Sequence, residues 1–221
     1  MIAAAGMEAG GKRAPTLHTC AGSRGLRCTW AAAEAGVALD LRLLPFPPRR
    51  LAPEYLALNP LGTVPLLVHG ATRMTESCAI AHYLAVLGEA QSLVVQPGEP
   101  DYGEYLDYTY HADATLTFPQ TVYMRFALFE KERGLAEAGE AYARWFEKRL
   151  VKIEQRLEDR DYLCAGRFTV ADICIGYALI LAGKVGLDAA LTPGLRVYRA
   201  RLTAREAYRR AEASERAEVA A

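Results

Sequence analysis

The stretch NPLGTVPLLVHGATRMTESCAIAHYLAVLG, residues 59–88, carries the pattern that decides the fold. In its first half, VPLLVHGATRM places two short apolar runs on either side of His-Gly, which predicts a β-hairpin. In its second half, Ile80, Leu84 and Leu87 recur at helical spacing before a closing glycine. The stretch is therefore expected to fold as two antiparallel strands followed by a helix.

The residues before this stretch alternate between strand and helix patterns. PTLHT (15–19) and VALDLRLL (37–44) predict two short strands, and RGLRCTWAAAEAG (24–36) predicts a helix that ends at its glycine. PFPPRR (45–50) predicts a stiff, extended loop, and APEYLALNP (52–60) predicts a short helical turn. The expected order is β-α-β-α-β-β-α, an α/β layer whose sheet is closed by the antiparallel hairpin.

Strand patterns disappear after residue 100, and helical patterns replace them. AYARWFEKRLVKIEQRLEDR (141–160) predicts one amphipathic helix, and GLRVYRARLTAREAY (194–208) predicts the last helix. Between them, RFTVADICIGYALILAGKVG predicts a buried helix that begins with a capping box of Thr169 and Asp172. We therefore expect an α/β domain followed by an all-α domain.

The domain boundaries follow from these changes of pattern. Residues 1–14 are rich in Gly and Ala and lack the features of a secretory signal, so we expect a flexible extension. Residues 15–90 form the α/β domain, and the Pro- and Gly-containing segment 91–100 is the linker. Residues 101–210 form the helical domain, and the polar residues 211–221 are expected to be a frayed tail.

Composition excludes several classes of protein. The 221 residues carry 26 Lys+Arg and 26 Asp+Glu, a balance that argues against nucleic acid as the main partner. No uninterrupted apolar run reaches about 18 residues, so we expect no membrane-spanning helix. The five cysteines show no paired spacing and no His/Cys cluster typical of a metal site, which favours reduced thiols in a cytoplasm and no bound metal.

The candidate chemistry lies in TCAGSRGLRCTW, residues 19–30, where a strand gives way to a helix. Cys20 and Ser23 are the two side chains there that could act as a nucleophile or polarise one. A cysteine could form a covalent bond with a substrate thiol, whereas a serine could only polarise a thiol that belongs to another molecule. Which of the two acts decides the kind of enzyme.

Four motifs give the chain a resemblance to cytosolic glutathione transferases over about residues 15–210. They are GSRGLRCTWAAAEAG, EYLALNPLGTVPLL, MTESCAIAHYL and FTVADI, in this order. The first is similar to the GSRxxR…W stretch of bacterial members. The resemblance implies a thioredoxin-like N-terminal domain, a helical C-terminal domain and a cytoplasmic homodimer. The implied reaction conjugates reduced glutathione to small apolar electrophiles.

The resemblance also implies how glutathione would be held. The Val64–Pro65 bond would be cis, which turns the N–H and C=O of Val64 towards the backbone of the tripeptide. Glu76 and Ser77, at the start of the next helix, match the ammonium and carboxylate groups of the γ-glutamyl end.

Two further glutathione contacts are expected. The ligand's glycine carboxylate would meet a cation of the loop before the third strand, where Arg49 and Arg50 are available and Arg50 is preferred. Asp113, on the first long helix, would reach across the dimer to the γ-glutamyl ammonium.

In the family, the glutathione thiol lies near the start of the first helix, where its pKa is lowered. Ser23 falls within about a residue of the position of the serine hydroxyl in serine-type members, and Arg24 could stabilise the thiolate charge. Cys20 falls too early for the position of the cysteine in cysteine-type members and is expected to be a buried thiol.

The second substrate is expected between the two domains. Tyr108, His111 and Thr115 follow each other at i, i+3 and i+7 and so share one helix face, an aromatic-rich surface suited to apolar electrophiles. The alternative is that these residues pack the helix core. Pro119 should kink the same helix.

Two alternative functions stay open on the sequence. The first is a glutathione-dependent thiol-disulfide oxidoreductase or lyase that uses Cys20. The second is a scaffold of the same fold that binds ligands or partners without catalysis.

Overall fold

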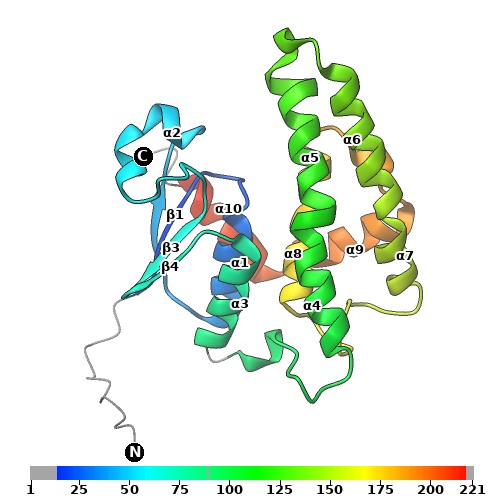
Figure 1. The fold of residues 1–221 in the computed structure, drawn as a ribbon. Coiled ribbons are helices and arrows are strands. Elements are labelled where there is room, and N and C mark those ends of the chain that lie inside the picture. The colour runs from blue at the N-terminus through cyan, green and yellow to red at the C-terminus, as the bar shows by residue number, and fades with distance from the viewer. Residues whose placement is uncertain (1–13, 89, 218–221) are drawn as a thin grey trace, which may run out of the picture.

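The computed structural model describes residues 14–88 and 90–217 (Figure 1). The expected extension therefore lies outside the described residues, apart from Ala14. The described residues form an N-terminal α/β layer and a C-terminal set of helices, as predicted. No helix among them is long and apolar enough to cross a membrane.

The sheet contains four short strands in the order β2-β1-β3-β4. Strand β1 pairs with β2 in parallel and with β3 in antiparallel orientation, and β3 and β4 form the predicted hairpin. The strands are β1 (Thr16–Thr19), β2 (Asp40–Leu43), β3 (Leu66–His69) and β4 (Thr72–Met74). The pairing places the carboxyl end of β1 at the centre of the sheet, next to the candidate loop.

Helices α1 (Leu26–Ala35) and α3 (Ser77–Leu87) cover one face of this sheet. Leu17 and Leu67 of the strands pack there against Ile80 and other apolar side chains of the two helices. Helix α1 ends as predicted, because the glycine that follows it adopts a left-handed conformation with φ of 68°.

The other face carries the segment that the sequence described as an extended loop and a turn. The prediction for residues 45–50 is wrong in part, because Pro48–Leu51 form the short helix α2. A proline is well suited to the first turn of a helix, where its missing N–H has no partner to lose. The predicted turn is the 3₁₀ helix Pro53–Ala57, whose Tyr55 packs on the sheet.

The C-terminal domain begins with a long helical column. It consists of α4 (Tyr102–His111), a π-helical stretch (Ala112–Thr117), α5 (Phe118–Tyr123) and a second π-helical stretch (Met124–Phe129). Pro119 is the second residue of α5, which follows the first π-helical stretch. The proline, which cannot donate a backbone hydrogen bond, is thus accommodated with a change of helical pitch.

Two predicted helices are each divided in the structure. The helix predicted over 141–160 is α6 (Ala136–Arg149) and α7 (Val151–Leu157), separated by a tight turn at Leu150. The last predicted helix is α9 (Pro193–Thr203) and α10 (Glu206–Ala217), so residues 211–217 are helical rather than frayed.

Helix α8 (Val170–Lys184) forms the centre of the second domain and is buried along nearly its whole length. The predicted capping box is present: Asp172 accepts from the Thr169 backbone N–H at 2.8 Å. The same fully buried carboxylate accepts from the Tyr198 hydroxyl at 2.6 Å and from the Leu163 N–H at 3.0 Å. Asp172 therefore caps α8 and also joins it to the segments that carry Leu163 and Tyr198.

Replacing Asp172 by Ala should lower the free energy of unfolding by about 3 kcal/mol, since it removes a helix cap and leaves buried donors without an acceptor. Urea denaturation followed by circular dichroism would measure the change. Asp161→Ala, at an exposed carboxylate, is the matched control and should change stability little. Equal losses in the two variants would contradict this role.

Candidate functional site

The loop between β1 and α1 presents Ser23 at the start of the helix. The Ser23 hydroxyl lies 3.0 Å from Thr19 Oγ1 and accepts from the Gly25 N–H at 3.3 Å. Thr19 is fully buried, and its hydroxyl also lies 3.3 Å from the carbonyl of Cys20. A hydroxyl has one proton, so Ser23 can donate to an incoming ligand only when Thr19 donates to Ser23.

Gly25 makes this arrangement possible. A Cβ at this position would lie 1.8 Å from Thr19 Oγ1, so any side chain would displace the threonine. The close approach of loop and strand keeps Ser23 at the start of α1, where the first N–H groups bond to carbonyls of the loop and the helix dipole favours negative charge.

Cys20 lies in the same loop but in a different environment. Its side chain is 1% exposed, and the thiol donates to the carbonyl of Pro45 at 3.6 Å. Burial, and after it the charge of Glu215, raises the pKa of the Cys20 thiol to about 11. The group is therefore a protonated, inward-facing thiol at neutral pH, which matches the prediction of a buried thiol and opposes a nucleophilic role.

Two predicted glutathione contacts lie close to this loop in the fold. The Val64–Pro65 peptide bond is cis, as predicted. Glu76 is exposed and precedes the first turn of α3, whereas Ser77 is buried at 3% exposure. The Ser77 hydroxyl accepts from Arg27 at 2.9 Å, which leaves its own proton free to be donated.

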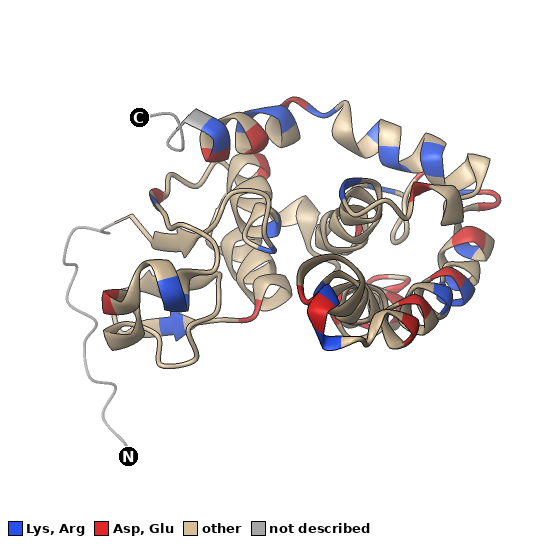
Figure 2. Cartoon of the chain, turned by 90° about the horizontal axis from the view of Figure 1, so that it is seen from above, with Lys and Arg blue, Asp and Glu red and all other residues tan. Residues whose placement is uncertain are grey.

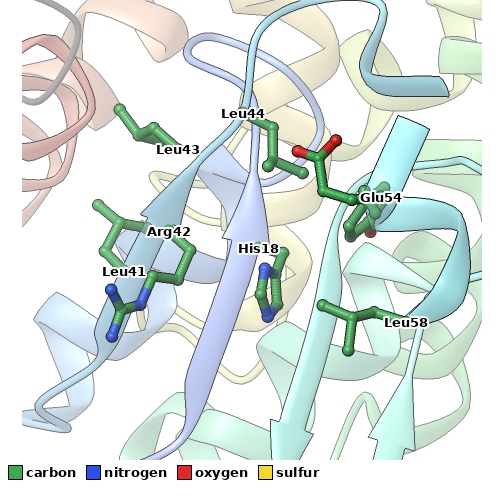
Figure 3. Close-up of a pocket in the computed structure, with 8 residues that line it drawn as sticks. His18, Leu41, Arg42, Leu43, Leu44, Glu54 and Leu58 are labelled. Carbon is green, nitrogen blue, oxygen red and sulfur yellow. The ribbon is translucent and has the colours of Figure 1, made fainter. Parts of the chain in front are cut away.

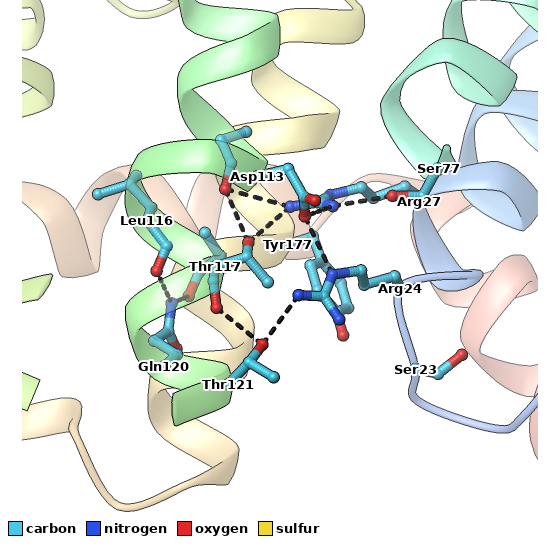
Figure 4. A network of polar contacts seen from close by, with 12 residues as sticks. Ser23, Arg24, Arg27, Ser77, Asp113, Leu116, Thr117, Gln120, Thr121 and Tyr177 are labelled. Carbon is cyan, nitrogen blue, oxygen red and sulfur yellow. Dashed lines mark hydrogen bonds and ion pairs between the residues drawn. The ribbon is translucent and has the colours of Figure 1, made fainter. Parts of the chain in front are cut away.

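Arg27 is the residue that the sequence analysis missed. Its side chain is fully buried, although it is a charged group. Its Nη1 donates to Asp113 at 2.8 Å and its Nη2 to Thr117 at 2.7 Å, and its guanidinium lies 4.6 Å from the centre of the Tyr177 ring. Figure 4 shows Arg27 within this network. In the sequence, the available signal was a single arginine within the apolar, Ala-rich run of α1.

Arg24 completes the network from the same helix start. It donates to Asp113 at 3.0 Å and to Thr121 at 2.8 Å, and about a third of its side chain is exposed. Figure 4 shows Ser23 apart from the network, with Arg24 between it and the helical column.

Asp113 was expected to reach a ligand across a dimer, and the structure gives it a different environment. Its carboxylate is bound by Arg24 and Arg27 of its own chain. Burial raises the pKa of Asp113, but the two guanidinium groups outweigh burial, and the net pKa is lowered. Asp113 therefore links the two domains as an ionised carboxylate.

The face expected to bind the second substrate differs from the face of the column that meets α1. The face of the column that meets α1 carries Asp113, Thr117 and Thr121. Tyr108 is buried and has the Lys152 ammonium of α7 at 5.2 Å from its ring centre.

The other two residues of that expected face give no better support. His111 is half-buried, and its pKa is lowered by burial and then by Lys152, which places it on the α7 side of the column. Thr115 is half-buried, and its hydroxyl has no hydrogen bond to another described residue. The alternative of helix packing therefore fits Tyr108 and His111.

The remaining predicted contact lies at α2. Arg49 and Arg50 are exposed, and neither forms a salt bridge with another described residue. Nothing in the fold distinguishes Arg50 from its neighbour.

A cavity of about 520 Å³ lies elsewhere, at the β2 edge of the sheet. His18 and Arg42 project into it from adjacent strands, and Glu54 forms part of the opposite wall (Figure 3). Four leucines and Tyr55 complete its lining, and none of the residues of the Cys20–Gly25 loop takes part. No group of His, Cys, Asp and Glu that could hold a metal is found in the described part of the chain.

Comparison with known proteins shows which proteins the chain resembles. The model of the glutathione S-transferase N-terminal domain matches residues 22–87. Glutathione S-transferase 1 of Schizosaccharomyces pombe is 34% identical over 128 residues, which cover 55% of this chain and 55% of that protein. The chain is therefore similar to glutathione S-transferases. The chain thus spans about half the length of this curated glutathione S-transferase in the alignment.

Solved glutathione S-transferases share the whole fold. A sphingomonad glutathione S-transferase complexed with glutathione has 25% identity and a TM-score of 0.77, over 90% of this chain and 98% of its own. The bacterial glutathione S-transferase BphK has 24% identity and a TM-score of 0.78 with the same coverage. The thioredoxin-like N-terminal domain followed by a helical domain is therefore confirmed.

Replacing Asp113 by Asn should lower the free energy of unfolding by about 3 kcal/mol at neutral pH, because it leaves the buried Arg27 charge uncompensated. The pKa of Asp113 is lowered in the folded protein, so its contribution is present above the unfolded-state pKa and is lost as pH falls through the folded-state pKa. Denaturant titrations of wild type and variant across the acidic range should therefore converge.

Asp107→Asn is the control for this experiment. Asp107 pairs with Lys152 on the exposed side of the same column, so its loss should cost at most about 1 kcal/mol. A pH-independent difference between wild type and Asp113→Asn would exclude the ionised link.

Proposed function

We propose that this chain is a glutathione transferase that uses no metal and adds the thiolate of reduced glutathione to small apolar electrophiles. The observation that carries the proposal is the Ser23 hydroxyl, which is partly exposed over the first turn of α1 and backed by Thr19. Similarity to glutathione S-transferases, one of them solved in complex with glutathione, supports glutathione as the ligand.

The proposed reaction requires only one ionisation of the ligand. The glutathione S–H loses its proton to solvent, and the sulfur electron pair forms a bond to an electrophilic carbon. In a substitution, that carbon expels a leaving group together with its bonding electron pair. In an addition to a double bond, the displaced π electron pair takes up a proton from solvent at the neighbouring atom. Ser23 donates a hydrogen bond to the thiolate, and the N–H groups of α1 add a favourable potential. Arg24 contributes charge, but Asp113 already offsets much of it, so we assign the larger part to Ser23.

We infer that the rest of glutathione lies along the edge of the N-terminal domain. Val64, before the cis proline, would pair with the ligand backbone, as in strand addition. The exposed Glu76 would meet the γ-glutamyl ammonium, and the start of α3 with Ser77 would meet its carboxylate. Arg50 is proposed for the glycine carboxylate, on account of its position in the loop before β3.

The electrophile is proposed to approach Ser23 from the side of the helical column. Support comes from Arg24, which spans from the loop to Thr121 of α5 and so brings this helix within one side chain of the reacting group. This proposal replaces the face of Tyr108 and His111, which packs on α7.

A homodimer is proposed from large apolar side chains that remain exposed. They occur on the α4–α5 column and on the segment around α2: Tyr110, Phe118, Phe46, Leu51, Leu58 and Leu61. A second copy of the chain is the proposed cover.

We propose a cytoplasmic location, because all five cysteines are free. Positive and negative side chains alternate along α10 and the outer helices (Figure 2). This mixed charge argues against a nucleic-acid partner.

Reduced glutathione at millimolar concentration should raise the melting temperature of the protein, and the pure protein should bind a glutathione resin. Differential scanning fluorimetry checks the first result. A protein that does neither has a different ligand. A scaffold without catalysis would pass this test but would conjugate none of a broad panel of electrophiles.

Ser23→Ala should lower kcat/KM for conjugation on the order of 100-fold, the usual cost of losing one donor to a developing anion. Cys20→Ala should leave conjugation close to wild type, since the thiol faces inward and its pKa is about 11. Steady-state kinetics with one chromogenic electrophile measure both variants.

The oxidoreductase or lyase alternative predicts that Cys20→Ala lowers turnover strongly and that Ser23→Ala leaves it close to wild type. Treatment with oxidised glutathione, followed by mass spectrometry, would then reveal one glutathionyl group on Cys20. Turnover that depends on Cys20 and survives in Ser23→Ala would establish this alternative and refute the transferase mechanism.

A further inference from the structure

We propose that Glu215, in the last helix, is a positioning residue that fixes the β1–α1 loop and thereby aims the Ser23 hydroxyl. The proposal rests on the function of Ser23 proposed above. Glu215 is 2% exposed, an unusual environment for a carboxylate near the end of a polar, surface helix. Helix α10 brings it there by packing against α1.

The two carboxylate oxygens of Glu215 bind two different parts of the site. One oxygen accepts from the backbone N–H of Gly22 at 2.8 Å, and the other accepts from the Thr29 hydroxyl at 2.9 Å. Gly22 belongs to the loop and directly precedes Ser23, whereas Thr29 belongs to the body of α1. A single carboxylate therefore fixes the loop relative to the helix on which it rests.

Gly22 is held from a second side by helix α8. The Tyr177 hydroxyl donates to the Gly22 carbonyl at 3.5 Å, so both backbone polar groups of this glycine have partners from the helical domain. Gly22 adopts φ of +70°, a left-handed turn at which the chain changes direction just before Ser23. Without Glu215 as the acceptor for the Gly22 N–H, the helical domain would hold this turn only through the bond from Tyr177 to the Gly22 carbonyl.

The buried charge of Glu215 costs free energy, and this cost argues for a specific role. Burial raises the pKa of Glu215, and the net pKa stays raised although the bonds from Gly22 and Thr29 and the charge of Lys184 lower it. A tail helix that needed only to cover α1 could place an apolar residue here at lower cost. The carboxylate instead supplies two acceptors at the one loop that carries the proposed catalytic hydroxyl.

Glu215→Ala should lower kcat roughly 10- to 100-fold, because displacement of a reacting group's partner by about 1 Å can cost that much. The affinity for glutathione should change little, since Val64 and the start of α3 are untouched. The pKa of the bound glutathione thiol, followed by ultraviolet absorbance of the thiolate, should rise. Glu215→Gln retains an acceptor for the Gly22 N–H and should recover much of kcat, and Thr29→Val should fall between the two.

Glu206→Ala is the matched control, because Glu206 lies on the same helix and pairs only with Arg210 at the surface among the described residues. It should leave kcat and the thiol pKa unchanged. A fall in kcat for Glu215→Ala that Glu215→Gln does not reverse, or a loss of glutathione affinity equal to the loss of kcat, would overturn the proposal.

A ligand-free measurement separates this proposal from the proposed function. Hydrogen exchange with mass spectrometry should show faster exchange in the peptide covering residues 20–25 in Glu215→Ala, with the β3–β4 hairpin unchanged. If the wild type shows no conjugation but the loop responds in this way, the holding role of Glu215 stands and the assigned reaction is wrong. Exchange that rises equally throughout the chain, or not at all in the loop, would reject the positioning role.

Discussion

The structure depends on one buried cation. Arg27 extends from α1 into the interface between the domains, where it has no contact with solvent. Taking a guanidinium out of water is costly, and only a set of well-placed acceptors offsets the cost. Asp113, Thr117 and Ser77 supply them from two helices of different domains. The relative placement of α1, α3 and the helical column is therefore fixed by where this charge can be satisfied.

The candidate site lies at the edge of this arrangement. Arg27 binds Ser77 at the start of α3, and its neighbour Arg24 spans to α5. The loop before them carries Ser23 over the first turn of α1. The N-terminal domain thus supplies the proposed glutathione contacts, while the second domain fixes the loop that would act on the sulfur.

Features that depend on a few neighbouring residues could be predicted from the sequence. The hairpin, the glycine that ends α1 and the capping box of Asp172 belong to this class. Each is decided within about five residues, where turn chemistry and capping act. The motifs that indicated the family have the same local character.

Features that depend on distant partners could not be predicted. Tyr108 and His111 share a face, but the pattern does not say which helix that face meets, and a π-helical stretch follows directly. Glu215 lies in a polar segment that was expected to fray, and its partner Gly22 is 193 residues away. Asp113 was assigned to a ligand because no sequence rule pairs it with an arginine in the first helix.

The burial of Arg27 between the two domains has a consequence for recombination between related proteins. A chimaera that joins this N-terminal domain to the helical domain of another member would bring a guanidinium into an interface built for a different set of side chains. Such a hybrid would fold well only if the incoming column carried a carboxylate and a hydroxyl one helical turn apart, at the positions of Asp113 and Thr117. The two domains thus form a matched pair in this chain, and their boundary is a poor place to exchange parts.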